Sequence, residues 1–161
     1  MIRPVYTYLL LISAIFLLLT GCEGGLEPPP PEPEPVGAIS GKVFYTGEWP
    51  PSSEFRELIF VPLPFTPTDF SQVLGEFIRG TLRSSDRLQT FVDSEEFFVG
   101  ELENGVYVYN IIANQFGSDI FKDWRPLGVY KENGGLITIN GDTVEVTIFV
   151  DFDNLPPFPP E

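Results

Sequence analysis

Five acidic side chains stand in two short runs where carboxylates could meet. Asp151 and Asp153 have i, i+2 spacing, which would place both carboxylates on one face of a sheet. With Asp93, Glu95 or Glu96 they could form an oxygen cage for calcium. No EF-hand or other ordered ligand loop is present, so a solvated acidic edge is the plainer interpretation. A glycosidase pair is a further alternative, but spacing along the chain does not give the separation that it requires.

Two tryptophans, Trp49 and Trp124, stand beside prolines in expected loops. If exposed, they could stack on sugar rings or anchor a protein interface, as a ligand-binding pair. The alternative is that each caps the core at one end of the domain. We favour capping, because large aromatic side chains in small domains are mostly buried.

Three arginines, Arg79, Arg83 and Arg87, recur every four residues. This spacing places them on one side of a helix or of a regular strand, where they could contact an anionic partner through phosphate or carboxylate groups. Pairing with nearby acids such as Glu76 or Asp86 is the plainer interpretation, because exposed ion pairs are common and weak.

The composition removes several classes of function. The 161 residues contain no histidine and one cysteine, which excludes Ser-His-Asp and Cys-His catalysis and metal sites built on imidazole. The formal net charge of −14 repels the phosphates of nucleic acids. We therefore expect no enzymatic activity, no cofactor and no nucleic-acid partner.

The single cysteine ends a membrane-directed leader. Arg3 supplies a positive start, residues 5–19 form an apolar stretch, and small residues precede Cys22. The stretch is shorter than the roughly 20 residues that cross a bilayer comfortably, and turn formers follow it. A secretory signal is therefore favoured over a permanent transmembrane helix.

The run Leu19-Thr20-Gly21-Cys22 resembles the lipobox of bacterial lipoproteins. The resemblance implies cleavage between Gly21 and Cys22 and a diacylglycerol on the Cys22 sulfur, with palmitate as the expected class of acyl chain. Several acyl chains, at about 0.8 kcal/mol per buried methylene, would hold the chain at a membrane almost permanently. An ordinary secreted protein with an incidental cysteine is the alternative.

The implied location is the non-cytoplasmic side of a bacterial envelope. If the host has an outer membrane, sorting there is favoured, because Glu23 does not match the aspartate retention signal of enteric bacteria. Cleavage removes one base, Arg3, and leaves 8 basic against 23 acidic residues, a formal charge of −15.

Composition divides the chain into four segments. Residues 22–36 form a Pro/Glu-rich linker that acts either as an extended polyproline rod or as a leash without a preferred length. At roughly 3.1 Å per residue it spans some 30 to 40 Å. The segments are a signal peptide at 1–21, the lipidated linker at 22–36, a β domain at 37–153 and a proline-rich tail at 154–161.

Residues 37–153 show the hydrophobic alternation of strands. It is clearest from Thr143 to Asp151, where Val144, Val146 and Ile148 alternate with polar residues. Seven or so short strands at this spacing predict an all-β fold, a single antiparallel β-sandwich. Further strands are expected at 38–45, 56–61, 95–102, 106–113, 127–131 and 136–139.

Two glycine turns predict how four of these strands pair. Asn140-Gly141 is a strong hairpin signal and should join 136–139 to 143–151. Glu103-Asn104-Gly105 should likewise join 95–102 to 106–113.

Residues 63–90 predict a proline-rich loop and then a short helix or an irregular strand. Phe70, Val73 and Phe77 have helical spacing, but Gly75 and Gly80 weaken a helix by roughly 1 kcal/mol each. We expect this insertion to cover an open sheet edge.

Three stretches resemble the carboxypeptidase-regulatory-like, or transthyretin-like, β-sandwich family. They are residues 39–43, 102–108 and 137–150. In the middle stretch, Gly105 can adopt a positive φ and the Tyr107 hydroxyl can find a backbone partner. The resemblance implies a non-catalytic accessory, folding or binding module and carries over no catalytic residue.

The sequence thus predicts a lipid-anchored, non-enzymatic interaction or accessory module of the cell envelope, with an envelope protein or glycan as its partner. A carbohydrate- or calcium-binding module is the alternative.

Overall fold

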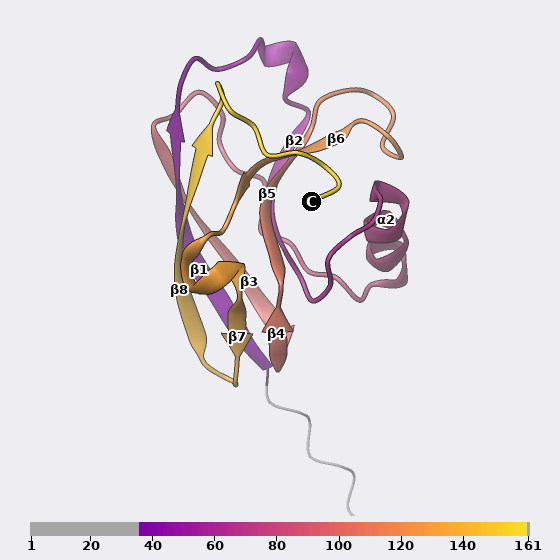
Figure 1. Ribbon diagram of the computed structural model, residues 1–161, viewed down its shortest axis with the longest axis vertical. Coiled ribbons are helices and arrows are strands. Elements are labelled where there is room, and N and C mark those ends of the chain that lie inside the picture. Colours follow the sequence, from indigo (N-terminus) through magenta and orange to yellow (C-terminus); the bar gives the residue numbers. More distant parts are fainter. Residues whose placement is uncertain (1–35, 161) are drawn as a thin grey trace, which may run out of the picture. The chain divides into compact units, whose positions relative to one another are not determined.

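The computed structural model describes residues 36–160 and is mostly β (Figure 1). Within that range it contains eight strands in three small sheets and one short α-helix. No helix in this part of the chain is long and apolar enough to span a membrane. The predicted leader, the Gly21–Cys22 cleavage and the lipid on Cys22 lie outside the described residues.

The strands follow the predicted alternation closely. Those expected at 38–45, 56–61 and 143–151 are confirmed, while the strand expected at 127–131 begins earlier. The strands are β1 (Val36–Thr46), β2 (Glu57–Leu63), β3 (Ser94–Glu103), β4 (Gly105–Tyr107), β5 (Tyr109–Gln115), β6 (Trp124–Val129), β7 (Ile137–Ile139) and β8 (Thr143–Asp151). The helix is α2 (Phe70–Arg79), and 3-10 turns occupy η1 (Ser52–Glu54) and η2 (Glu132–Gly135).

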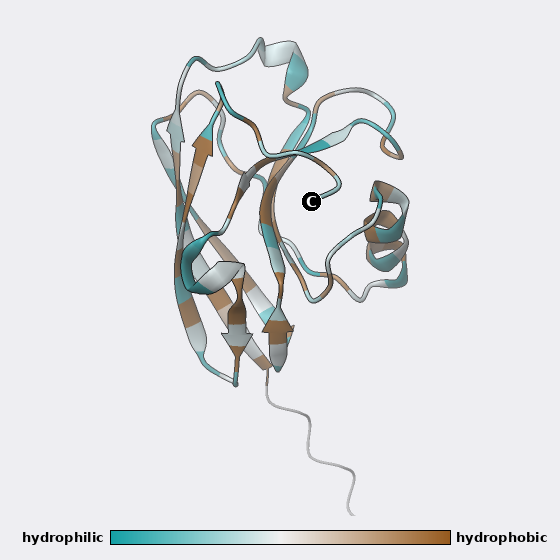
Figure 2. Ribbon diagram, in the orientation of Figure 1, coloured by the Kyte–Doolittle hydropathy of each residue, from teal (hydrophilic) through white to brown (hydrophobic). Residues whose placement is uncertain are grey.

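Two three-stranded sheets, ordered β3-β1-β8 and β2-β5-β6, share one hydrophobic core. Phe60 of β2 stacks on Phe97 of β3 with ring centroids 4.4 Å apart. Where β6 passes β8, a Cβ on Gly128 would lie 2.8 Å from the Phe149 carbonyl oxygen, so only glycine fits there. Figure 2 shows apolar residues along the strands of both sheets and on α2.

The prediction of antiparallel pairing throughout is wrong, because β1 and β8 run parallel, with Ile39 beside Val144. The predicted hairpin between 136–139 and 143–151 is wrong. Gly141 does turn the chain, at φ 84°, but β7 pairs with β4 instead of with β8. In that position Ile137 and Ile139 are fully buried in the main core, which an isolated hairpin could not provide.

The second predicted hairpin is also wrong, because β3 and β5 belong to different sheets. β5 lies centrally between β2 and β6, and both of its faces are covered. The local prediction at the turn does hold: Gly105 has φ 157°, and the Tyr107 hydroxyl donates to the Glu103 carbonyl at 3.1 Å.

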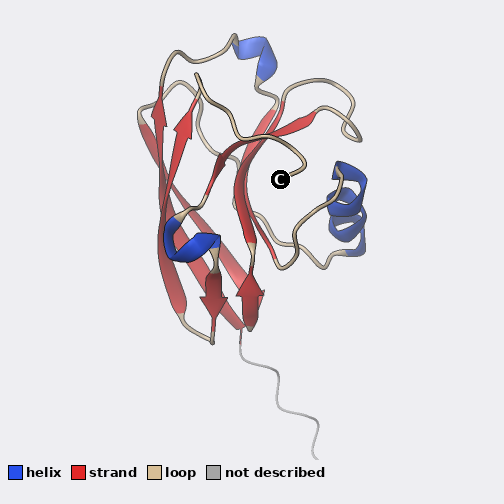
Figure 3. Ribbon diagram, in the orientation of Figure 1, coloured by secondary structure: helices blue, strands red, loops and turns tan. Residues whose placement is uncertain are grey.

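The 63–90 insertion contains the short helix and also covers a sheet edge. Asp69 caps α2 by accepting from the Gln72 amide at 3.0 Å, and Gly80 ends the helix in the left-handed conformation. Downstream, the Ser85 and Leu88 amides donate to β2 carbonyls at 3.0 and 2.7 Å, so the expected edge cover is confirmed. In addition, α2 covers a face of the β2-β5-β6 sheet (Figure 3).

Candidate functional site

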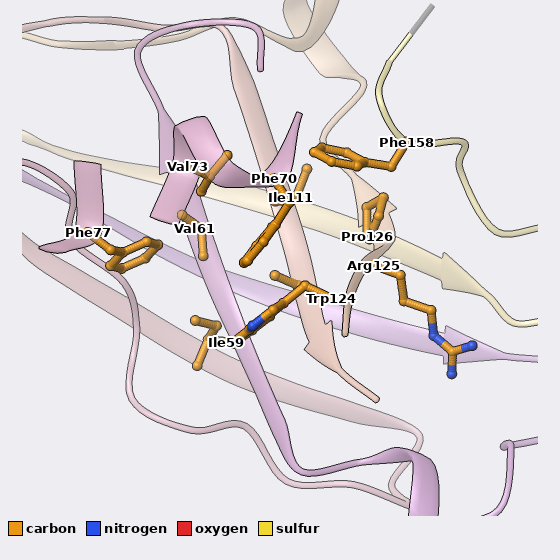
Figure 4. A pocket seen from close by; sticks show the side chains of 11 residues that line it. Ile59, Val61, Phe70, Val73, Phe77, Ile111, Trp124, Arg125, Pro126 and Phe158 are labelled. Carbon is orange, nitrogen blue, oxygen red and sulfur yellow. The ribbon is translucent and has the colours of Figure 1, made fainter. Parts of the chain in front are cut away.

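An apolar groove lies between α2 and the outer face of the β2-β5-β6 sheet (Figure 4). Its floor consists of Ile59 and Val61 from β2 and Ile111 and Ala113 from β5. These side chains point away from the main core, because their neighbours in sequence, such as Ile112, point into it. The open space is only about 40 Å³, so the surrounding side chains fill most of the groove.

The roof of the groove is the apolar stripe of α2. Phe70, Val73 and Phe77 follow the helical spacing and face the sheet. Val73 is 5% exposed, whereas Ile78 on the other side of the helix is 73% exposed. The helix therefore rests on the sheet through one narrow stripe.

Trp124 forms one wall of the groove. Its ring stacks on Phe70 with centroids 5.7 Å apart, and its indole N–H donates to the Ile120 carbonyl at 3.1 Å. Ile120 and Phe121, in the loop before it, are 52% and 57% exposed. This hydrogen bond joins the wall of the groove to a loop that exposes two apolar side chains.

Arg125 contributes to the lining of the groove, but its charged guanidinium group binds partners outside the groove. Its guanidinium pairs with the Glu54 carboxylate at 2.8 Å and donates to Asn114 Oδ1 at 3.2 Å. Figure 4 shows the side chain directed away from the helix stripe. The groove therefore presents apolar side chains to a ligand, without a charged group facing it.

The structure separates the two candidate tryptophans. Trp49 caps the main core, as we favoured, in an aromatic cluster with Tyr45, Phe55, Phe91 and Phe152 at centroid distances of 4.7, 5.2, 5.2 and 4.5 Å. The Tyr45 hydroxyl is buried there without a hydrogen-bond partner among the described residues. Burial, with a smaller contribution from Glu95, raises the pKa of Tyr45 far above its usual value of 10.

The three arginines do not share one helix or strand, because Gly80 ends the helix after Arg79. Arg79 pairs with Glu76 at 2.6 Å, as the plainer interpretation expected. Arg83 lies 3.5 Å from Glu101, and Arg87 takes part in no ion pair within residues 36–160. The pair at Arg79 is exposed and contributes little to stability.

The acidic runs do not assemble a metal site in the described part of the chain. No group of three or more histidine, cysteine or acidic side chains that could hold a metal occurs there. The Asp153 amide donates to Asp151 Oδ1 at 3.1 Å. This bond is a local turn at the end of β8.

Of the residues that line the groove, the sequence analysis singled out only Trp124 as a site candidate, and one of the others lies outside the predicted domain. Phe158 belongs to the tail beyond the predicted domain, yet its ring lines the groove beside Pro126 (Figure 4). The signal was a lone aromatic residue between two pairs of prolines, at 156–157 and 159–160.

No family model, curated protein or solved structure matches this chain. The chemistry of the groove is therefore the main guide to function. Aromatic and aliphatic side chains without a facing charge suit the burial of apolar groups, and they offer nothing that would polarise a bond or move a proton.

Proposed function

We propose that this chain is a lipoprotein of the bacterial cell envelope whose folded unit is a non-enzymatic binding module for a protein partner. The leader and the Leu19-Thr20-Gly21-Cys22 run support the anchor, and with it a location on the non-cytoplasmic side of a membrane. The observation that carries the binding role is the apolar groove under α2, whose wall residue Trp124 is hydrogen-bonded to the loop that exposes Ile120 and Phe121.

The proposal also includes the specific type of β fold. Two sheets around one core, with Gly105 and Tyr107 at the two ends of β4, support a sandwich of the transthyretin-like type. The parallel pairing of β1 and β8 is a departure from an all-antiparallel sandwich. An accessory module of that type has no need of catalytic residues.

A carbohydrate-binding module is the second candidate, because of one aromatic pair on the other sheet. Phe44 of β1 and Phe149 of β8 stack on the outer face with centroids 5.6 Å apart, and Lys42 lies 5.3 Å from the centre of the Phe44 ring. Phe149 is 64% exposed. Such a platform could stack on a sugar ring while polar neighbours bind its hydroxyls.

Site-specific photo-crosslinking in cells distinguishes these candidates. A crosslinking amino acid at Phe77, which lines the groove, or at Ile120, whose carbonyl accepts from Trp124, samples the groove, and one at Glu145 samples the sheet that carries the aromatic pair. We expect a defined protein adduct from the first two positions and none from Glu145. Adducts from Glu145 alone would favour the second candidate instead. So would a loss of solvent exposure at Phe149 that depends on added glycan.

The anchor has its own test. Changing Cys22 to Ala should abolish incorporation of labelled palmitate and release the chain from the membrane fraction. Equal labelling of both forms would contradict the lipoprotein assignment.

A further inference from the structure

The C-terminal segment of this chain occupies its own groove. From Leu155 to Pro160 the tail leaves β8 and ends beside β5 and α2 (Figure 1). Leu155 packs on the edge of the main core, and Phe158 packs against the groove layer under α2. One aromatic side chain, flanked on both sides by two prolines, is thus inserted into the apolar site.

Apolar contact alone holds this segment. No hydrogen bond joins residues 155–160 to any other described residue; the last one in the chain is the Asn154 amide to the Asp151 carbonyl at 3.1 Å. Four of the six residues are prolines, which have no N–H to donate. Another segment of the same chemistry could therefore take its place without breaking a hydrogen bond.

The groove suits such a segment in general. Proline-rich segments bind grooves lined by aromatic side chains, since their extended form loses little entropy on binding. Here the Phe70–Trp124 stack, Phe77 and Pro126 supply that lining. Phe158 marks the position where an aromatic anchor is inserted.

We propose that the groove binds an extended, proline-flanked aromatic segment of a partner protein, and that the tail occupies the site in cis until the partner displaces it. This inference rests on the proposed binding role but does not need the lipid anchor. The tail acts as a tethered competitor, which limits binding to partners that are present at high local concentration.

The strength of this competition can be estimated. Phe158 lies only a few residues beyond the end of β8, and such a short tether gives an effective concentration on the order of millimolar. A free peptide with a dissociation constant of about 100 μM would then bind the unaltered chain roughly tenfold more weakly than a chain with a vacant groove.

The test uses the full chain and a labelled peptide of residues 154–161, NLPPFPPE, with fluorescence anisotropy as the readout. Phe158→Ala should bind the peptide at least about tenfold more tightly than the unaltered chain. A peptide with alanine in place of phenylalanine is the matched control and should lose that binding. Equal affinity of both chains, or of both peptides, would overturn the proposal.

A second measurement needs no variant. In methyl NMR of the unaltered chain, unlabelled peptide at millimolar concentration should shift the Leu155 signals of the displaced tail and leave Val43 in the main core unchanged. An unchanged Leu155 signal would overturn the proposal, whether or not Phe158→Ala folds. Dimers that form by exchange of tails between copies would also overturn it, because the occupant would then be a second copy.

These results separate the two proposals. If the peptide fails but crosslinking from Phe77 still yields an envelope protein, the tail inference falls and the proposed function stands. If the peptide binds and no envelope protein crosslinks, the proposed function falls.

Discussion

The two faces of the β2-β5-β6 sheet differ in how they are covered. The inner face packs against a second sheet, and residues there such as Phe60 and Ile112 have no exposed surface. The outer face is covered by α2, of which only Val73 is buried, and by Phe158 of the tail. A sheet that is tightly packed on one face can keep its position while the segment that covers its other face is replaced by another.

The largest expected effect is on the inner face. Phe60→Ala removes a fully buried ring that stacks on Phe97 and should lower the free energy of unfolding by about 3–5 kcal/mol. Urea denaturation, with an unchanged slope, measures this loss. A loss below about 1 kcal/mol would mean that the two sheets do not share a rigid core.

A matched pair of valines compares the faces directly. Val43→Ala in the main core should cost about 2 kcal/mol, and Val73→Ala on α2 about 1 kcal/mol. The same two methyl groups are removed, but α2 can settle into the space, whereas β1 is fixed between β3 and β8. Equal losses in urea denaturation would contradict the distinction between the layers.

Alkaline pH tests two buried hydroxyls, Tyr45 in the main core and Tyr109 in the groove layer. Neither has a hydrogen-bond partner among the described residues, and burial raises the pKa of both. Above pH 10 the unfolded chain loses these protons while the folded chain keeps them, so stability falls as pH rises, by about 1.4 kcal/mol per pH unit for each tyrosine still protonated.

Tyr45→Phe should remove its share of that decline and leave stability at pH 7 nearly unchanged, since no hydrogen bond is lost. Denaturation midpoints at pH 7 and pH 11 give the comparison. The prediction fails if the variant declines as steeply as the unaltered chain.

The tail is expected to contribute less than the main core. Phe158→Ala removes a half-buried ring from a segment without hydrogen bonds and should cost about 1.4 kcal/mol, which corresponds to the roughly tenfold competition of the tail for the groove. Thermal melting of both chains measures it. A loss as large as that of Phe60→Ala would show that the tail is part of the core and is not displaceable.

Much of the local structure could be predicted from the sequence. Alternation identified β1, β2 and β8, and the Gly105–Tyr107 turn behaved as its residues require. Helical spacing indicated α2 as one of two alternatives, the other being an irregular strand. These features depend on neighbours within a few residues, where backbone geometry and side-chain period decide the outcome.

The groove could be predicted only in part. Trp124 was singled out and lines the groove, but Trp49 and the arginines lie elsewhere, and Phe158 was assigned to a tail outside the domain. Spacing along the chain does not reveal which distant residues share a cavity.

By itself the sequence determined most of the strands, the helical spacing of Phe70, Val73 and Phe77, and the absence of imidazole chemistry. Only the tertiary structure decided that β7 pairs with β4, that β1 and β8 run parallel, and that Phe158 returns to the groove. The reason is physical: strand partners and groove occupants are selected by the apolar surface they bury together, and that surface exists only once the two sheets have met.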